Sequence, residues 1–200
     1  MTPSRPDHST LTDDELIRLI RGGAPDAFEE LVRRTRRPAY RLARRITRNH
    51  EDADDVVQES FVKAYRAIDR FTLGKAIAPW VLTIVARTAL SAIRQSKRRS
   101  ASALDEPGPD GSAPLADRVA DPASDPAALT RRLEVERAFA TLSEEHRVVL
   151  ALRVEGDLPY ASIADALGVP VGTVMSRLAR AREALIEAMS HSRKAVADES

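Results

Sequence analysis

The 200-residue sequence contains no cysteine, and its aromatic residues amount to only 4%. A chain without cysteine forms neither disulfides nor thiolate zinc sites, which fits a reducing compartment. No apolar run reaches the roughly 18 residues of a membrane span, and the N-terminus lacks the apolar core of a signal peptide. We therefore expect no contact with a membrane and a cytoplasmic location.

Strand signals are missing as well. The sequence shows neither a sustained alternation of apolar and polar residues nor an Asn-Gly hairpin. It is rich in alanine, leucine, arginine and glutamate, which favour helices. The prediction is an all-α fold, in which two small helical domains are joined by a flexible acidic linker.

Signals of catalysis are also scarce. The four histidines are scattered over different segments, at His8, His50, His146 and His191. The sequence has no nucleophile turn, no P-loop and no dinucleotide fingerprint. We predict that the chain is not an enzyme and that it holds no catalytic residue, no metal and no cofactor.

Charge is present in both signs and is strongly segregated. The formal net charge is +1, from 31 lysines and arginines against 30 aspartates and glutamates. The basic residues form runs such as Arg33-Arg34, Arg36-Arg37, Arg44-Arg45 and Lys97-Arg98-Arg99. Segregation of this kind suits a chain that binds both nucleic acid and a basic protein surface.

Changes in composition and the positions of helix-ending residues divide the chain into five segments. We predict a disordered N-terminus over 1–10, a helical domain over 11–99, a flexible linker over 100–126, a second helical domain over 127–189 and a polar tail over 190–200. The linker prediction rests on five prolines and an acidic, apolar-poor composition, which could avoid or mimic nucleic acid.

The first domain has clear helix signals. Thr12 and Glu15 form a capping box, and Gly22-Gly23 ends the first helix. The second helix is expected over 26–47 with a kink or break at Pro38, and Asn49 is expected as its left-handed stop. The third runs over 52–68, with an apolar side of Val56, Val57, Phe61, Ala64, Tyr65 and Ile68. A loop over 71–79 leads to a fourth helix opened by Pro79.

The third helix carries a stripe of acidic and amide side chains opposite its apolar side: Asp52, Asp55, Gln58 and Glu59. No base or metal partner accompanies them, so the stripe is a poor catalytic site. It is a good docking surface for a basic helix, and a merely solvated acidic surface has the same pattern.

The stretch from Leu158 to Arg182 predicts a helix-turn-helix, with Pro159 opening the first helix and Gly168 turning the chain in the left-handed conformation. Its second helix has a core stripe of Val174, Leu178, Ala181 and Leu185. Small residues and arginines on another face suit the DNA major groove. They are Met175, Ser176, Ala179 and Arg180, flanked by Thr173, Arg177 and Arg182. An ordinary helical hairpin with a solvated basic surface has similar spacing.

Four sequence segments carry a family resemblance: GAPDAFEELV, DADDVVQESFVKAYRAIDRF, PWVLTIVARTALSAIRQSKRR and LSEEHRVVLALRVEGDLPYASIADALGVPVGTVMSRLARARE. In this order, over about residues 11–189, the chain resembles the extracytoplasmic-function (ECF) sigma factors, the compact alternative sigma subunits of bacterial RNA polymerase.

The resemblance implies three interfaces and a regulator. The acidic stripe would dock on the β′ clamp of core polymerase, and the β flap is a further expected contact on the polymerase. The non-template strand of the opened −10 element would be held by Phe71, Thr72, Lys75, Trp80, Arg87, Arg94, Lys97, Arg98 and Arg99. The paired −35 element would be bound by Thr173, Met175, Ser176, Arg177, Ala179, Arg180 and Arg182. An anti-sigma factor is the expected regulator.

One alternative function stays open. A conventional regulator could use the same helix-turn-helix to bind operator DNA as a dimer, without being a sigma subunit. The first domain lacks the βα alternation of a receiver domain, which argues against that alternative. Tight dimeric binding to a palindrome without polymerase would favour it.

Overall fold

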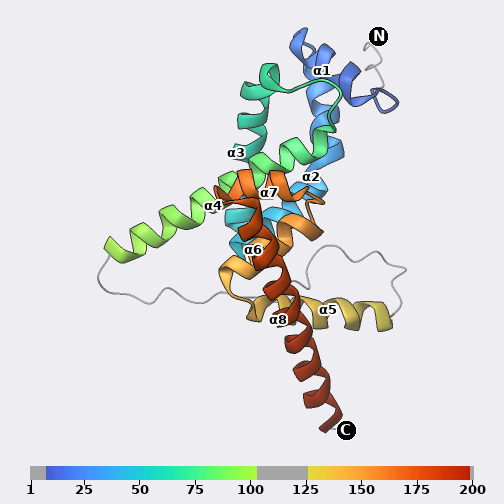
Figure 1. The fold of residues 1–200 in the computed structure, drawn as a ribbon. Coiled ribbons are helices and arrows are strands. Elements are labelled where there is room, and N and C mark those ends of the chain that lie inside the picture. Colours follow the sequence, from blue (N-terminus) through green and yellow to red (C-terminus); the bar gives the residue numbers. More distant parts are fainter. Residues whose placement is uncertain (1–7, 103–125, 199–200) are drawn as a thin grey trace.

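The computed structural model describes residues 8–102 and 126–198. Within these ranges the chain forms eight α-helices and one short 3-10 helix, without a strand, which confirms the all-α prediction (Figure 1). Most of the predicted disordered N-terminus (1–10) and most of the predicted linker (100–126) lie outside the described residues.

The N-terminal unit, residues 8–102, contains α1 (Asp13–Arg21), α2 (Pro25–Thr47), α3 (His50–Ala67), the 3-10 helix η1 (Ile68–Arg70) and α4 (Ile77–Ser102). The capping box is confirmed: the Glu15 N–H donates to Thr12 Oγ1 at 3.3 Å, and Glu15 Oε2 accepts from the Thr12 N–H at 2.8 Å. The longest helices, α2, α3 and α4, pack together around fully buried leucines and valines.

The structure excludes a break in α2 at Pro38, one of the two predicted alternatives, and corrects the predicted stop after the helix. The helix continues through Pro38 without a break, although proline removes one backbone hydrogen bond. Thr35 and Ala39, on either side, are fully buried, so packing holds the helix together. The left-handed residue after α2 is Arg48, with φ 64°, and not Asn49. Asn49 is extended and accepts the Glu51 N–H at 3.1 Å, so it caps α3 instead.

The C-terminal unit, residues 126–198, contains α5 (Pro126–Thr141), α6 (Glu144–Val154), α7 (Tyr160–Leu167) and α8 (Val171–Asp198). Gly168 has φ 68° between α7 and α8, as the helix-turn-helix prediction requires. Helix α8 continues to Asp198, so the residues expected as a polar tail are largely helical.

The two units lie against each other (Figure 1). Helix α2 packs on α6, and α4 packs on α7. The guanidinium of Arg45 on α2 also lies 4.4 Å from the centre of the ring of Phe139 on α5. Nothing in the sequence pattern indicated that the units would touch.

Helix α4 corrects the expectation that no segment is long and apolar enough to span a membrane. Over Ile77–Arg99 it meets that test by length and composition. Its fully buried residues, which include Val81, Val85 and Ala89, belong to the core of the protein, and Arg87 interrupts the apolar sequence. Packing within the chain therefore accounts for the apolar residues of α4.

Candidate nucleic-acid and partner interfaces

The acidic stripe lies on the solvent side of α3. All four of its residues, Asp52, Asp55, Gln58 and Glu59, are exposed. Glu59 forms an ion pair of 2.8 Å with Lys63 one turn later, and both side chains stay about half exposed. The alternating burial along α3 thus presents carboxylates outward, where a basic partner can reach them.

An apolar groove of about 380 Å³ continues this surface toward the end of α3. Val62 and Tyr65 are 48% and 53% exposed, and the Tyr65 ring contacts Phe28 edge to face at 5.0 Å. The sequence placed Tyr65 on the buried side of the third helix. Because Phe28 lies only partly buried on α2, the tyrosine ring covers it from outside and remains accessible.

The loop between η1 and α4 is fixed by the first helix. Asp14 Oδ1 accepts the Gly74 N–H at 2.8 Å, and Asp13 Oδ2 accepts the Ile77 N–H at 2.9 Å. Arg21 donates to the backbone carbonyls of Ile68 and Asp69 at 3.0 and 3.1 Å. Sequence reasoning missed this role, because Asp13 and Asp14 also fit the first turn of α1.

Within this loop the predicted −10 residues differ in exposure. Thr72 and Lys75 are exposed, whereas Phe71 is 5% exposed and belongs to the core. The Phe71 ring contacts Trp80 edge to face at 5.3 Å, and Trp80 is half-buried. The structure therefore places Phe71 behind Trp80, and the indole, the threonine and the lysine remain accessible.

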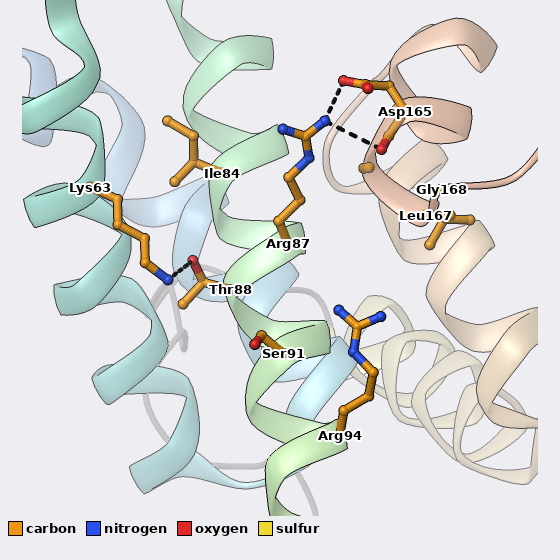
Figure 2. Close-up of a pocket in the computed structure, with 10 residues that line it drawn as sticks. Lys63, Ile84, Arg87, Thr88, Ser91, Arg94, Asp165, Leu167 and Gly168 are labelled. Atoms are coloured by element: carbon orange, nitrogen blue, oxygen red, sulfur yellow. Dashed lines mark hydrogen bonds and ion pairs between the residues drawn. The ribbon is translucent and has the colours of Figure 1, made fainter.

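The predicted −10 cations Arg87, Arg94, Lys97, Arg98 and Arg99 are all exposed on α4. An open cavity of about 560 Å³ lies between α4 and α7, lined by Lys63, Arg87, Thr88 and Arg94 on one side and Asp165–Gly168 on the other (Figure 2). Lys63 Nζ donates to Thr88 Oγ1 at 3.2 Å, and Thr88 itself is buried. The cations on the α4 side of this cavity therefore face the carboxylate of Asp165, to which Arg87 is already paired.

The predicted −35 residues lie on α8 beyond its buried stripe. Val174, Leu178 and Ala181 are at most 1% exposed, whereas Leu185 is only partly buried. Met175, Ser176, Ala179, Arg180 and Arg182 are exposed, and Thr173 and Arg177 are half-buried. Arg177 donates to Glu145 at 3.1 Å, and Ser176 Oγ donates to the Thr173 carbonyl at 3.0 Å. The surface of the helix-turn-helix that is predicted to face DNA is accessible.

One internal ion-pair cluster supports the N-terminal unit. Glu30, 8% exposed, accepts from Arg33 and Arg34 at 2.7 Å. Hydrogen bonds from Arg33, and further those from Arg34, lower the pKa of Glu30 to about 2. Arg34 also donates to the carbonyls of His8 and Leu11 at 3.0 and 2.8 Å. These arginines therefore stabilise the fold and are less available to nucleic acid.

Among the residues that the structure describes, no group of three or more histidine, aspartate or glutamate side chains is placed to hold a metal ion. The described surface offers charged and apolar contacts for macromolecules, distributed over α3, α4 and α8.

Comparison with known proteins matches both units. The family model "Sigma-70 region 2" matches residues 31–99, and "Sigma-70, region 4" matches residues 132–185. The ECF RNA polymerase sigma factor SigM of Mycobacterium tuberculosis is 34% identical over 181 residues, which cover 90% of this chain and 86% of SigM. The ECF RNA polymerase sigma-E factor of Escherichia coli is 34% identical over 178 residues, covering 88% and 93% of the two chains.

Two solved structures share the fold. One is the sigma factor RpoE in complex with the anti-sigma factor NepR from Bartonella quintana, with a TM-score of 0.61 and 23% identity. It covers 82% of this chain and 96% of that one. The other is CnrH in complex with the cytosolic domain of CnrY, with a TM-score of 0.58, covering 90% and 97%.

Proposed function

The chain belongs to the ECF sigma factors of bacterial RNA polymerase, and from this premise we propose how its surfaces divide the work of promoter-specific initiation. The N-terminal unit corresponds to sigma region 2 and the C-terminal unit to region 4. The chain directs core polymerase to promoters, and the polymerase supplies the chemistry. It acts in the cytoplasm, where the polymerase and its DNA are found.

The acidic stripe of α3 docks on the polymerase clamp. Support comes from the exposure of all four stripe residues and from the neighbouring groove, where Val62 and Tyr65 can receive an apolar side chain of the same partner helix. Carboxylates steer a basic partner, and a buried aromatic contact strengthens the complex.

The loop after η1 and the cations of α4 hold the opened −10 strand. Accessible Trp80 offers a ring for an unstacked base, and Thr72 and Lys75 offer polar contacts beside it. Farther along α4, Lys97, Arg98 and Arg99 bind phosphates. Phe71 supports the indole of Trp80 by packing against it from the core.

The exposed surface of α8 binds the paired −35 element. Met175, Ser176, Ala179 and Arg180 face bases, and Thr173, Arg177 and Arg182 hold phosphates. One of the two solved structures that share the fold, that of RpoE, is a complex with the anti-sigma factor NepR. We extend this to the present chain and propose that an anti-sigma factor regulates it.

One observation carries the proposal: the acidic stripe and the two cationic DNA surfaces lie on different helices and are exposed. The test is run-off transcription with purified core polymerase on a random promoter library. Promoter-selective transcripts that depend on this chain, from sites with a −35 and a −10 element, are the expected result. Tight dimeric binding to a palindrome without polymerase, and no gain in transcription, would support the operator-binding alternative.

A further inference from the structure

In the ion pairs between the two units, each unit contributes charges of only one sign. The N-terminal unit supplies the cations and the C-terminal unit the carboxylates in every ion pair that the structure describes between them. These pairs are Arg41–Glu155, Arg45–Glu155, Arg45–Glu136, Arg87–Asp165 and Lys97–Glu144. A cationic surface that binds nucleic-acid phosphates would form the same one-sided set of ion pairs if carboxylates took the place of the phosphates.

Arg45 of α2 is the centre of this contact. Its Nη1 and Nη2 donate to the two carboxylate oxygens of Glu136 at 3.1 and 2.8 Å, and its Nε donates to Glu155 at 3.0 Å. Glu155 also binds Arg41 Nε at 3.0 Å, one helical turn earlier on α2. Arg45 is 16% exposed and Glu155 12%, so solvent screens these pairs less than a surface pair.

The same contact covers part of the predicted −10 surface. Arg87 Nη2 lies 2.5 Å from Asp165 Oδ2 and also donates to the Asp165 carbonyl at 3.3 Å (Figure 2). Lys97, farther along α4, pairs with Glu144. The carboxylates of the C-terminal unit therefore sit where the −10 strand would bring its phosphates.

The contact also contains an unfavourable element, so it is suited to opening. Arg147 of α6 is 8% exposed, and its Nε has no hydrogen-bond partner among the described residues. Burial, and in addition the positive charge of Arg48 on the N-terminal unit, lower the pKa of Arg147. Separation of the units would remove the nearby Arg48 charge from Arg147.

We propose that Arg41 and Arg45 of α2 extend the DNA-binding surface of α4 and bind promoter backbone phosphates, and that in the free chain carboxylates of the C-terminal unit occupy this surface. A guanidinium that binds a carboxylate with two parallel hydrogen bonds fits a phosphate in the same way. The inference rests on the proposed function, because it assumes that α4 binds the −10 element.

In the free chain the two units lie against each other, an arrangement called closed here, and it covers only some of the proposed binding surfaces. The acidic stripe of α3 and the −35 surface of α8 stay exposed, whereas Arg45, Arg87 and Lys97 are paired within the chain. The apparent affinity for −10 DNA is then the intrinsic affinity multiplied by the fraction of open molecules. Docking of the stripe on polymerase does not require the units to separate, but binding of the −10 strand does.

Two double variants separate the roles of the paired groups. Glu136→Gln with Glu155→Gln removes carboxylates and opens the units, and Arg41→Gln with Arg45→Gln also opens them but removes phosphate ligands. Separation is followed by energy transfer between dyes on Asp69→Cys and Ser190→Cys, which label specifically because the chain has no native cysteine. DNA binding of the full chain is measured with a forked −10 probe that lacks the −35 element.

Both double variants are expected to lower energy transfer. The glutamate variant should bind the forked probe about three- to tenfold more tightly, since more molecules are open, and the arginine variant should bind it more weakly than the parent chain. Matched controls are Glu145→Gln with Glu183→Gln, and Arg36→Gln with Arg37→Gln, which make the same charge changes at exposed positions that take part in none of the described ion pairs between the units. They should leave energy transfer unchanged.

The inference is overturned if the glutamate variant opens the units without tighter binding, or if the arginine variant binds the probe as well as its Arg36/Arg37 control does. Circular dichroism melting identifies a variant that fails to fold, and the single variant Arg41→Gln, at a 44% exposed position, then replaces the arginine pair. Run-off transcription by the parent chain separates the two proposals. If the parent chain is active and the probe results are negative, only the present inference fails, whereas an inactive parent chain contradicts the proposed function.

Discussion

The carboxylate of Asp13 accepts a hydrogen bond of 2.9 Å from the backbone N–H of Ile77, so the first helix caps the fourth across 64 positions of sequence. Asp14 binds the Gly74 N–H in the same way at 2.8 Å. The loop that carries Thr72 and Lys75 is therefore held at both its turn and its exit into α4. Its conformation depends on α1, which itself carries none of the proposed DNA contacts.

Removal of this cap should loosen the loop. Asp13→Asn is expected to lower the free energy of unfolding by about 1–2 kcal/mol, because the Ile77 N–H and Arg34 lose a charged partner. Amide hydrogen exchange at Gly74 and Ile77 should become faster. Glu51→Gln, an exposed change in the first turn of α3, is the control. Equal protection of the Ile77 amide in Asp13→Asn and the parent chain would contradict the capping role.

Charge reversal on the acidic stripe should weaken polymerase binding. Asp55→Lys with Glu59→Lys is expected to reduce the affinity for core polymerase at least about tenfold, since like charges then face each other across the interface. Contact of the C-terminal unit with −35 DNA should not change. Glu29→Lys with Asp69→Lys changes the net charge equally at exposed positions outside the stripe. If both double variants bind core polymerase equally, the stripe is not the docking surface.

Substitutions of two arginines of α8 should affect recognition of the promoter sequence in different ways. Arg180→Ala is expected to cost about 1–3 kcal/mol at one base pair of the −35 element and to relax specificity there. Arg182→Ala should weaken binding to all DNA sequences equally. It should also reduce the slope of log affinity against log salt concentration by about 1. Binding titrations against a set of single-base-pair changes at two salt concentrations distinguish them. A uniform loss with Arg180→Ala would make it a phosphate ligand instead.

The turn of the helix-turn-helix should be sensitive to its glycine. Gly168 has φ 68°, a conformation that L side chains rarely adopt, so Gly168→Ala should destabilise the C-terminal unit by about 1 kcal/mol. Gly172 lies in α8 with open space where the methyl group of an alanine would lie, and Gly172→Ala should be neutral or stabilising by up to about 1 kcal/mol. Thermal melting compares the two, and the opposite order of melting temperatures would contradict the argument.

The ion pairs of Glu30 should make the free energy of unfolding depend on pH in the acidic range. Because Arg33 and Arg34 lower the pKa of Glu30 from 4.5 to about 2 in the folded chain, the carboxylate stabilises the fold above pH 4.5. This contribution is lost as the pH falls from 4.5 through 2. Urea titrations should show Glu30→Gln about 1–2 kcal/mol less stable than the parent chain at pH 7, with the difference shrinking toward pH 2. A difference independent of pH would indicate lost packing.

Much of this protein was predictable because helix signals are local. The capping box at Thr12, the cap at Ser143, the turn at Gly168 and the buried positions Val174 and Leu178 depend on residues within a few positions of one another. Amphipathic spacing also placed the acidic stripe and the proposed DNA-binding residues of α8 outside the core. No alternating pattern suggested a strand, and the described residues form none.

By itself the sequence determined the helices, the two units and the charge on each exposed helix surface, because propensity, capping and periodicity act over one or two turns. The tertiary structure alone decided that Phe71 is buried behind Trp80, that Asp13 caps Ile77, and that Arg45 lies between Glu136 and Glu155. Each of these contacts joins residues that are distant in sequence or on opposite sides of a loop. Only the packing of whole helices brings them within hydrogen-bond or van der Waals distance.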